Sequence, residues 1–203
     1  MIIMQQCLDA HLKTLEIGFM RYPAAETAAK HENIIREASR LFREHGFSGV
    51  SVAEIMRATG LTHGPFYNHF PSKDDLISRS LEHGMQSSLA DIEQLGKSSK
   101  KTAEYLDRYL STVHRDAPGQ GCTMAALAAD VRRLPKARHT FTTHVKAVID
   151  KMVSNFSWRS KRSTRGNSIR MLSSLVGALV LARAVDDEAF SKEILREARR
   201  GLA

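Results

Sequence analysis

The chain has 203 residues, 42% of them hydrophobic and 26% charged, which is ordinary for a globular protein with one sizeable core or two small ones. The two cysteines, Cys7 and Cys122, lack CxxC spacing, so neither a disulfide framework nor a zinc site is expected. The formal net charge of +8 suggests a polyanionic partner, yet residues 21–73 carry only seven Lys and Arg against five Asp and Glu. The net charge is therefore weak evidence for a polyanionic partner, and the function must be inferred from sequence motifs instead.

The N-terminal 27 residues are treated as an extension of uncertain status. They lack the basic region and the small-residue cleavage site of a signal peptide. Their apolar side chains would share one face of a helix: Leu8, Leu12, Leu15 and Phe19. The most apolar run, residues 171–182, is shorter than the roughly 18 residues that a membrane span requires. We therefore expect a cytoplasmic protein that makes no membrane contact.

The pattern over residues 28–75 predicts three helices and a tight turn. Apolar residues at helical spacing from Ile34 onward predict the first helix, and Gly46 is expected to end it, because glycine is common just after the last residue of a helix. Ser51 and Glu54 have the spacing of a capping box, which starts a short second helix. Gly60 then provides a turn. A third short helix is expected from a Thr62 cap to about residue 69, so residues 51–70 have the plan of a helix-turn-helix.

The rest of the chain, residues 76–203, also reads as helical. One long helix is expected from Ser72 to near Gly96, and others over about 100–114, 122–133, from Pro135 onward, 167–184 and 190–201. The helix over 100–114 would present Leu106, Tyr109, Leu110 and Val113 on one face. Strand-like alternation does not occur. The sequence therefore predicts an all-α fold of about nine helices.

Three blocks of sequence carry a family resemblance. They are Ile35-x-x-Ala38-x-x-Leu41-Phe42-x-x-x-Gly46-Phe47, then Ser51-Val-x-x-Ile55 with Ala58-Thr-Gly60-Leu61-Thr62, and Gly64-x-Phe66-Tyr67-x-His69-Phe70-x-Ser72-Lys73-x-x-Leu76. Together they resemble the TetR/AcrR family of transcriptional regulators, the last block most specifically. Met56 departs from the small residue that many members have there. The resemblance implies a helix-turn-helix domain over 28–75 and a helical ligand-binding and dimerisation domain over 76–203.

The resemblance also implies which residues contact DNA. Residues at the start of the recognition helix would lie nearest the bases, while others would bind phosphates. The implied DNA-binding residues are Ser51, Thr62, His63, Gly64, Pro65, Tyr67, Asn68, His69 and Lys73. Alternatives stay open for three of them: Tyr67 covering the small core, His69 packing locally, and His63 being a solvated surface residue.

For the later domain, the resemblance implies an unidentified small-molecule effector, which few buried charges would make apolar or weakly polar. Candidate pocket residues, for which ordinary core packing is the alternative, are Met85, Leu89, Tyr105, Tyr109, Cys122, Met124, Leu127, Phe141 and Val145. Cys122 has a second alternative role as a redox or electrophile sensor, because it precedes a predicted helix. The last two helices, about 167–184 and 190–201, would form a homodimer that matches a palindromic double-stranded operator.

The expected activity is repression that is relieved when an effector shifts the helix over 73–95 and changes the separation of the recognition helices. An enzyme is the first rival interpretation, but the sequence has no nucleotide-binding glycine motif, no HExxH and no local nucleophile signature. No cofactor or metal is expected. A sequence-nonspecific DNA-binding protein is the second rival, disfavoured by the modest positive charge of residues 21–73.

Overall fold

The computed structural model describes residues 24–158 and 163–202, so most of the predicted extension over 1–27 lies outside the described residues. Within these ranges the chain forms ten α-helices and one short 3₁₀-helix, and no strand. The all-α prediction is confirmed, with ten helices where about nine were expected. Among the described helices, none is long and apolar enough to cross a membrane.

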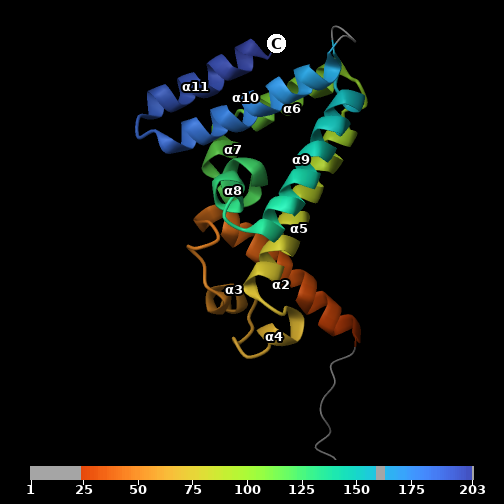
Figure 1. The fold of residues 1–203 in the computed structure, drawn as a ribbon. Coiled ribbons are helices and arrows are strands. Elements are labelled where there is room, and N and C mark those ends of the chain that lie inside the picture. Colours follow the sequence, from red (N-terminus) through yellow and green to blue (C-terminus); the bar gives the residue numbers. More distant parts are fainter. Residues whose placement is uncertain (1–23, 159–162, 203) are drawn as a thin grey trace, which may run out of the picture. The chain divides into compact units, whose positions relative to one another are not determined.

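The helices follow one another with short connections (Figure 1). Their bounds are α2 (Ala24–His45), α3 (Val52–Ala58), α4 (Phe66–His69), α5 (Lys73–Glu93), α6 (Ser99–Tyr109), α7 (Thr112–Asp116), η1 (Pro118–Gln120), α8 (Thr123–Val131), α9 (Pro135–Asn155), α10 (Thr164–Ala184) and α11 (Glu188–Gly201). Contacts divide the chain after Asn33, and Ile34–Ala203 form one compact unit. The domain boundary predicted at residue 75 remains a prediction.

Local capping explains where the first helices begin and end. Gly46 ends α2 with φ +74°, and a Cβ there would lie 2.7 Å from the Asp130 carboxylate, so only glycine fits without strain. The Ser51 hydroxyl accepts a hydrogen bond from the Glu54 N–H, while the Glu54 carboxylate accepts one from the Ser51 N–H. This is the predicted capping box. Gly60, with φ +75°, makes the turn after α3.

Two predicted helix boundaries are wrong for identifiable reasons. Thr62 does not cap α4, which begins at Phe66 with Pro65 in the capping position. A Thr62 cap would require an N–H from one of the next residues, and Pro65, at the third helical position, has none. The helix expected over 100–114 is two helices, because the Ser111 hydroxyl accepts the His114 N–H and starts α7. As a result Val113 is 78% exposed rather than on an apolar face.

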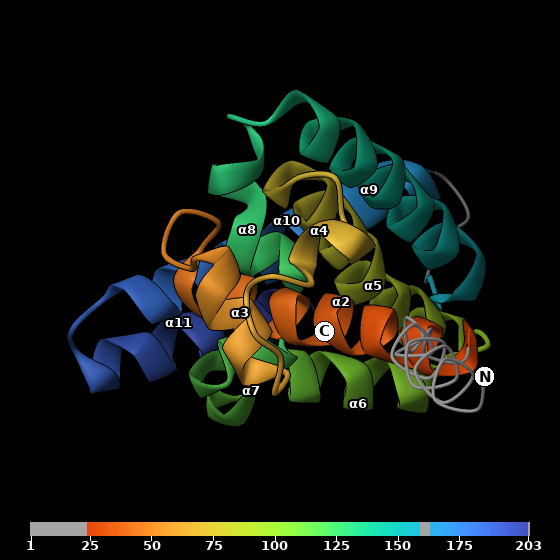
Figure 2. The same ribbon diagram turned by 90° about the horizontal axis from the view of Figure 1, so that it is seen from below.

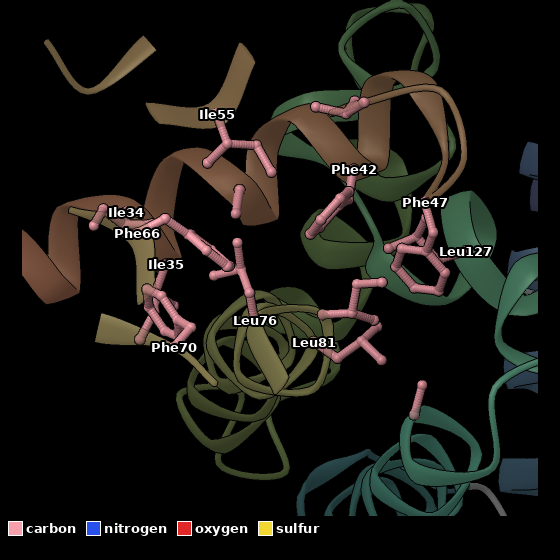
Figure 3. Close-up of a cluster of buried hydrophobic side chains, with 14 of the residues drawn as sticks. Ile34, Ile35, Phe42, Phe47, Ile55, Phe66, Phe70, Leu76, Leu81 and Leu127 are labelled. Atoms are coloured by element: carbon pink, nitrogen blue, oxygen red, sulfur yellow. The ribbon is translucent and has the colours of Figure 1, made fainter. Parts of the chain in front are cut away.

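The helix-turn-helix is built around a continuous hydrophobic cluster. Side chains from α2, α3, α4 and α5 point toward one another in Figure 3, and the cluster continues into α8 and α9. Its fully buried members from the first four helices include Ile34, Phe42, Ile55, Met56, Phe66 and Leu76, Phe70 joins them from the residue after α4, and the later helices contribute Leu127, Val131 and Ala137. Helices α2, α3 and α4 therefore share a core with the helices that follow them.

A second hydrophobic cluster lies among the later helices. α5 packs along α9, and α10 packs along α11, as Figure 1 shows. The cluster draws on α5, α6, α8, α9, α10 and α11. α10 begins at Thr164 and α11 ends at Gly201, within a few residues of the predicted bounds.

Acid is expected to weaken the later helices through His144. This residue lies in α9 with 8% exposure, its Nε2 has no hydrogen-bond partner, and burial lowers its pKa to about 4. At pH 5 the ring is then neutral in the folded chain and protonated in the unfolded chain, so stability is lost as pH falls from about 6.5 toward 4. We expect a loss of about 1 kcal/mol between pH 7 and pH 5 after allowance for solvent screening. Urea titrations of the natural chain and His144→Leu measure it; equal pH dependence in both would contradict this assignment.

Candidate nucleic-acid interface and cavity

α4 presents two faces of opposite character. Phe66 and Phe70 are buried and stacked, with ring centroids 5.6 Å apart. Tyr67, between them in sequence, is 66% exposed, and its ring meets that of His63 edge-on at 6.2 Å. Helical geometry alone produces this division, because neighbouring positions point about 100° apart. α4 therefore anchors by one side and offers the other to solvent.

The predicted DNA-binding residues before and within α4 lie largely on this open side. Thr62, His63, Gly64 and Asn68 are exposed, and Pro65 and His69 are half-buried. An added Cβ at Gly64 would meet nothing within 4 Å, so the space in front of this turn is free. Figure 2 views this end of the unit directly, with the ribbon of α4 and the turn that precedes it facing the reader. The arrangement can admit a polyanion to the backbone of residues 62–65.

Two of the predicted contacts, Ser51 and His69, also have local structural roles. The Ser51 hydroxyl donates to the Glu54 carboxylate at 2.7 Å, and this bond holds the pKa of Glu54 below its usual value. The His69 ring lies 6.3 Å from that of Phe70, so it packs locally as one interpretation anticipated. Tyr67, by contrast, is too exposed to serve mainly as a cover for the core.

Lys73 has a role that the sequence did not reveal. Its ammonium group donates to the carbonyl oxygens of Phe47 at 2.6 Å and Val50 at 2.5 Å, and it lies 5.9 Å from the centre of the Phe42 ring. Burial lowers its pKa. The side chain therefore ties the start of α5 to the loop between α2 and α3. An ammonium has three donors, so the expected phosphate contact remains a prediction.

A cavity of about 330 Å³ lies among α5, α6, α7, η1 and the start of α8. Of the nine predicted pocket residues, it is lined by Tyr105, Tyr109 and Cys122. The other six do not line it: Met85 and Leu127 belong to the helix-turn-helix cluster, Met124 to the second cluster, and Leu89, Phe141 and Val145 pack against these clusters. These six residues lie in or against the hydrophobic clusters, as the alternative of ordinary core packing predicts.

Polar residues make up much of the lining and were missed as candidates. They are Ser87, Ser88, Asp91, Arg108, Ser111, His114 and Gln120. Arg108 pairs with Asp91 at 2.8 Å and its guanidinium lies 5.7 Å from the centre of the Tyr105 ring. The spacing of Ser87, Ser88 and Asp91 places them on one face of a helix, and this polar face is the sequence signal for that part of the lining.

The cavity is joined to the helix-turn-helix by two contacts. Arg43 of α2 donates through Nε to the carbonyl oxygen of Gly119 at 3.0 Å, and through Nη2 to the same oxygen. Asp130, at the far end of α8, accepts the Phe47 N–H at 3.1 Å. Gly119 directly precedes the cavity-lining residue Gln120, so the first contact begins beside the cavity, whereas the second lies at the other end of the helix that starts at the cavity wall.

Comparison with known proteins agrees with this geometry. Residues 34–79 match the model of the family described as bacterial regulatory proteins, tetR family. The chain is 26% identical over 108 residues to the HTH-type transcriptional repressor DhaR of Mycobacterium sp. (strain GP1), covering 51% of this chain and 52% of DhaR. It is 37% identical over 68 residues to the HTH-type transcriptional regulator AcrR of Shigella flexneri, covering 34% of this chain and 31% of AcrR. These matches thus span about a third to a half of each relative.

Solved structures extend the likeness of fold over most of the chain. A TetR-family regulator from Agrobacterium tumefaciens superposes with a TM-score of 0.71 at 22% identity, covering 86% of this chain and 97% of that one. The reduced form of NemR from E. coli gives 0.72 at 19% identity, covering 86% and 95%. Residues 34–79 therefore form a helix-turn-helix domain of the tetR family of bacterial regulatory proteins, and the later helices share the fold of solved TetR-family regulators.

Proposed function

We propose that this chain is a cytoplasmic, dimeric repressor that binds a palindromic operator and leaves it when a small molecule occupies the cavity. The observation that carries the proposal is α4, which is anchored by buried Phe66 and Phe70 while Thr62, His63 and Asn68 stay exposed beside it. A recognition helix requires both properties, since it must be held rigidly and must present side chains to the major groove. That relatives such as DhaR are named repressors supports repression as the default.

Within this proposal the exposed residues have separate tasks. His63 reads a base edge, because an imidazole can donate to guanine N7 or O6. Asn68 has the donor and acceptor pattern that pairs with adenine. Tyr67 and His69 bind phosphates, which position the protein without reading sequence. Ser51, at the start of α3, offers a further phosphate position.

DNA binding is tested by fluorescence anisotropy on duplexes from the chain's own promoter region. We expect Tyr67→Ala to weaken binding by a similar factor on operator and scrambled duplexes, because a phosphate contact carries no sequence information. His63→Ala should instead lose affinity mainly for the operator, by about 1–3 kcal/mol. Footprinting is the control: a protected palindrome fits a specific regulator, whereas uniform coverage fits a nonspecific DNA-binding protein and contradicts the proposal.

Dimerisation through α10 and α11 is supported by apolar side chains that remain exposed on these helices: Ile169, Val180, Leu181 and Phe190. Gly177 has open space around it, which would let a neighbouring helix approach closely. A two-fold pair of chains would present two copies of α4 to half-sites about one DNA turn apart. In the footprinting sample, light scattering should therefore give two chains per particle.

Release of the operator requires that the cavity influence α4. The cavity wall includes Ser87, Ser88 and Asp91 of α5, so a bound molecule can act on α5 as the sequence suggested. The bonds from Arg43 to Gly119 and from Phe47 to Asp130 add a second route, through η1 and α8. A ligand that favours another arrangement of either route would shift the population away from the DNA-binding state.

A further inference from the structure

We propose that the turn between α8 and α9 carries a surface that steers double-stranded DNA toward α4. The surface consists of four cations, here called the basic corner: Arg132, Arg133, Lys136 and Arg138. The inference rests on the proposed function for its partner, the operator duplex. It goes beyond that function because these residues lie outside the helix-turn-helix and act on the rate of association rather than on the contacts of the bound complex.

The positive charge of the chain is concentrated in this part of the sequence. Residues 131–149 hold five Lys and Arg and no Asp or Glu, so they account for five of the eight net positive charges. Residues 21–73, which include α3 and α4, have seven Lys and Arg against five Asp and Glu. The helix-turn-helix therefore carries less net charge than the short stretch that contains the basic corner.

The four cations of the basic corner are exposed and available to a partner. Within residues 24–158 and 163–202, none of their side chains forms an ion pair or a hydrogen bond. Cations elsewhere do pair: Arg40 lies 2.7 Å from Glu44, and Arg79 lies 3.2 Å from Asp75. The acid next to the corner in sequence, Asp130, already accepts the Phe47 N–H.

Neighbouring elements do not cancel this charge. Residues 73–83 of α5, which packs along α9, hold two cations against three acids, a net charge of −1. That single charge is small beside the four cations of the corner. A positive potential is therefore expected to extend from this turn into the solvent.

The stability of the local structure does not account for these cations. Lys136 and Arg138 lie in the first turn of α9, where the positive end of the helix dipole disfavours positive charge and where no acidic residue is present. Arg132 and Arg133 are adjacent to each other just before it, so the four like charges repel one another. Relief of this repulsion by an external polyanion would favour association.

The corner is fixed relative to the helix-turn-helix. Ala137 is buried in the hydrophobic cluster of the helix-turn-helix, and Leu134 and Phe141 pack against that cluster. The bond from Phe47 to Asp130 ties the end of α8 to the loop after α2. In Figure 1 the turn from α8 to α9 lies beside α5, set back from α4. The four cations therefore attract DNA from a defined direction, while α4 and the turn before it remain the part that enters the groove.

Attraction at this range is effective because DNA is a dense polyanion. A duplex carries one negative charge per roughly 1.7 Å of its axis. The screening length is about 10 Å at 0.1 M salt and about 30 Å at 0.01 M. Steering by such a potential raises association rate constants by roughly 10- to 1,000-fold. Charges outside the contact region change mainly the association rate and its salt dependence, whereas lost contacts change mainly the dissociation rate.

The test is stopped-flow fluorescence with the full chain and a labelled duplex from its own promoter region. The variant combines Arg132→Gln, Arg133→Gln and Lys136→Gln. We expect its association rate constant to fall about fivefold at about 20 mM salt and by less than about 1.5-fold at about 300 mM, because screening removes the attraction. The dissociation rate constant should stay unchanged at both concentrations.

A matched control removes the same charge elsewhere. Lys97, Lys100 and Lys101 are exposed around the start of α6, which lies away from α4 in Figure 1. Their joint replacement by Gln should slow association by less than about 1.5-fold at about 20 mM salt, because these charges lie farther from the DNA-binding end. A second control, Arg132→Lys with Arg133→Lys, keeps the charge and should associate at the rate of the natural chain.

Three outcomes would overturn the inference. Equal slowing by the corner and α6 variants would mean that net charge alone matters. Faster dissociation without slower association would mean that the corner contacts phosphates in the bound complex. Association of the corner variant at the natural rate would mean that DNA does not use this surface. Circular dichroism melting checks that each variant is folded. If the natural chain binds no promoter duplex, the proposed function fails; if it binds and one of these three results is found, this inference alone fails.

Discussion

Phe66→Ala is expected to cost about 3–5 kcal/mol of the free energy of unfolding and to abolish operator binding. Phe66 is fully buried in α4, stacked on Phe70 and set edge-on to Tyr67 with ring centroids 5.1 Å apart. α4 has four residues, too few for a helix to persist without packing. Removing the ring therefore both leaves a cavity and frees α4, the proposed recognition helix.

Urea titration followed by circular dichroism measures the loss, and the anisotropy assay measures DNA binding. Tyr67→Ala is the matched control, because it removes a neighbouring but exposed ring and should change the free energy of unfolding by less than about 0.5 kcal/mol. If Phe66→Ala retained both its stability and operator affinity, α4 would not depend on this anchor.

Lys73→Met is expected to lower the free energy of unfolding by about 2 kcal/mol, because two charge-assisted hydrogen bonds are lost together. The carbonyl oxygens of Phe47 and Val50 lose their ammonium donor, while the methionine keeps most of the apolar stem beside Phe42. The loop between α2 and α3 should loosen. Urea titration measures the effect, and Arg79→Met, at an exposed ion pair on the same helix, is the control.

The same variant separates the two roles of Lys73. If the ammonium also binds a phosphate, the slope of log affinity against log salt should become shallower by roughly 0.9 in Lys73→Met. The slope is measured without urea, where the variant is folded. An unchanged slope would contradict the phosphate contact, and holding the loop between α2 and α3 would then be the role of Lys73.

The sequence alone predicted those structural features that depend on residues close together in the chain. The Ser51–Glu54 capping box and the positive-φ glycines at 46 and 60 are local signals, and each was predicted from residues within one helical turn. The predicted Thr62 cap is wrong because Pro65, three residues later, has no N–H to donate to the Thr62 hydroxyl. The break after Tyr109 was missed because the apolar spacing continued across it, whereas Ser111 starts a new helix.

The cavity could be predicted only in part, because it is made by residues distant in sequence. Tyr105, Tyr109 and Cys122 were expected from apolar or aromatic character, but Asp91 and Arg108 meet across 17 positions and their pairing has no local signature. The Lys73 tie spans 23 and 26 positions and was likewise invisible. Which polar groups find one another is decided by packing of helices, and periodicity does not contain that information.

The bonds from Arg43 to Gly119 and from Phe47 to Asp130 bear on the construction of hybrid sensors. Joining residues 28–75 of this chain to the later helices of a relative would cut both bonds at their acceptors. A relative that supplied the later helices would need a carboxylate opposite the Phe47 N–H, and any residue larger than glycine at position 119 would require the Glu44 side chain to move. Exchange of modules in this protein is therefore governed by a few main-chain contacts as much as by the linker that is cut.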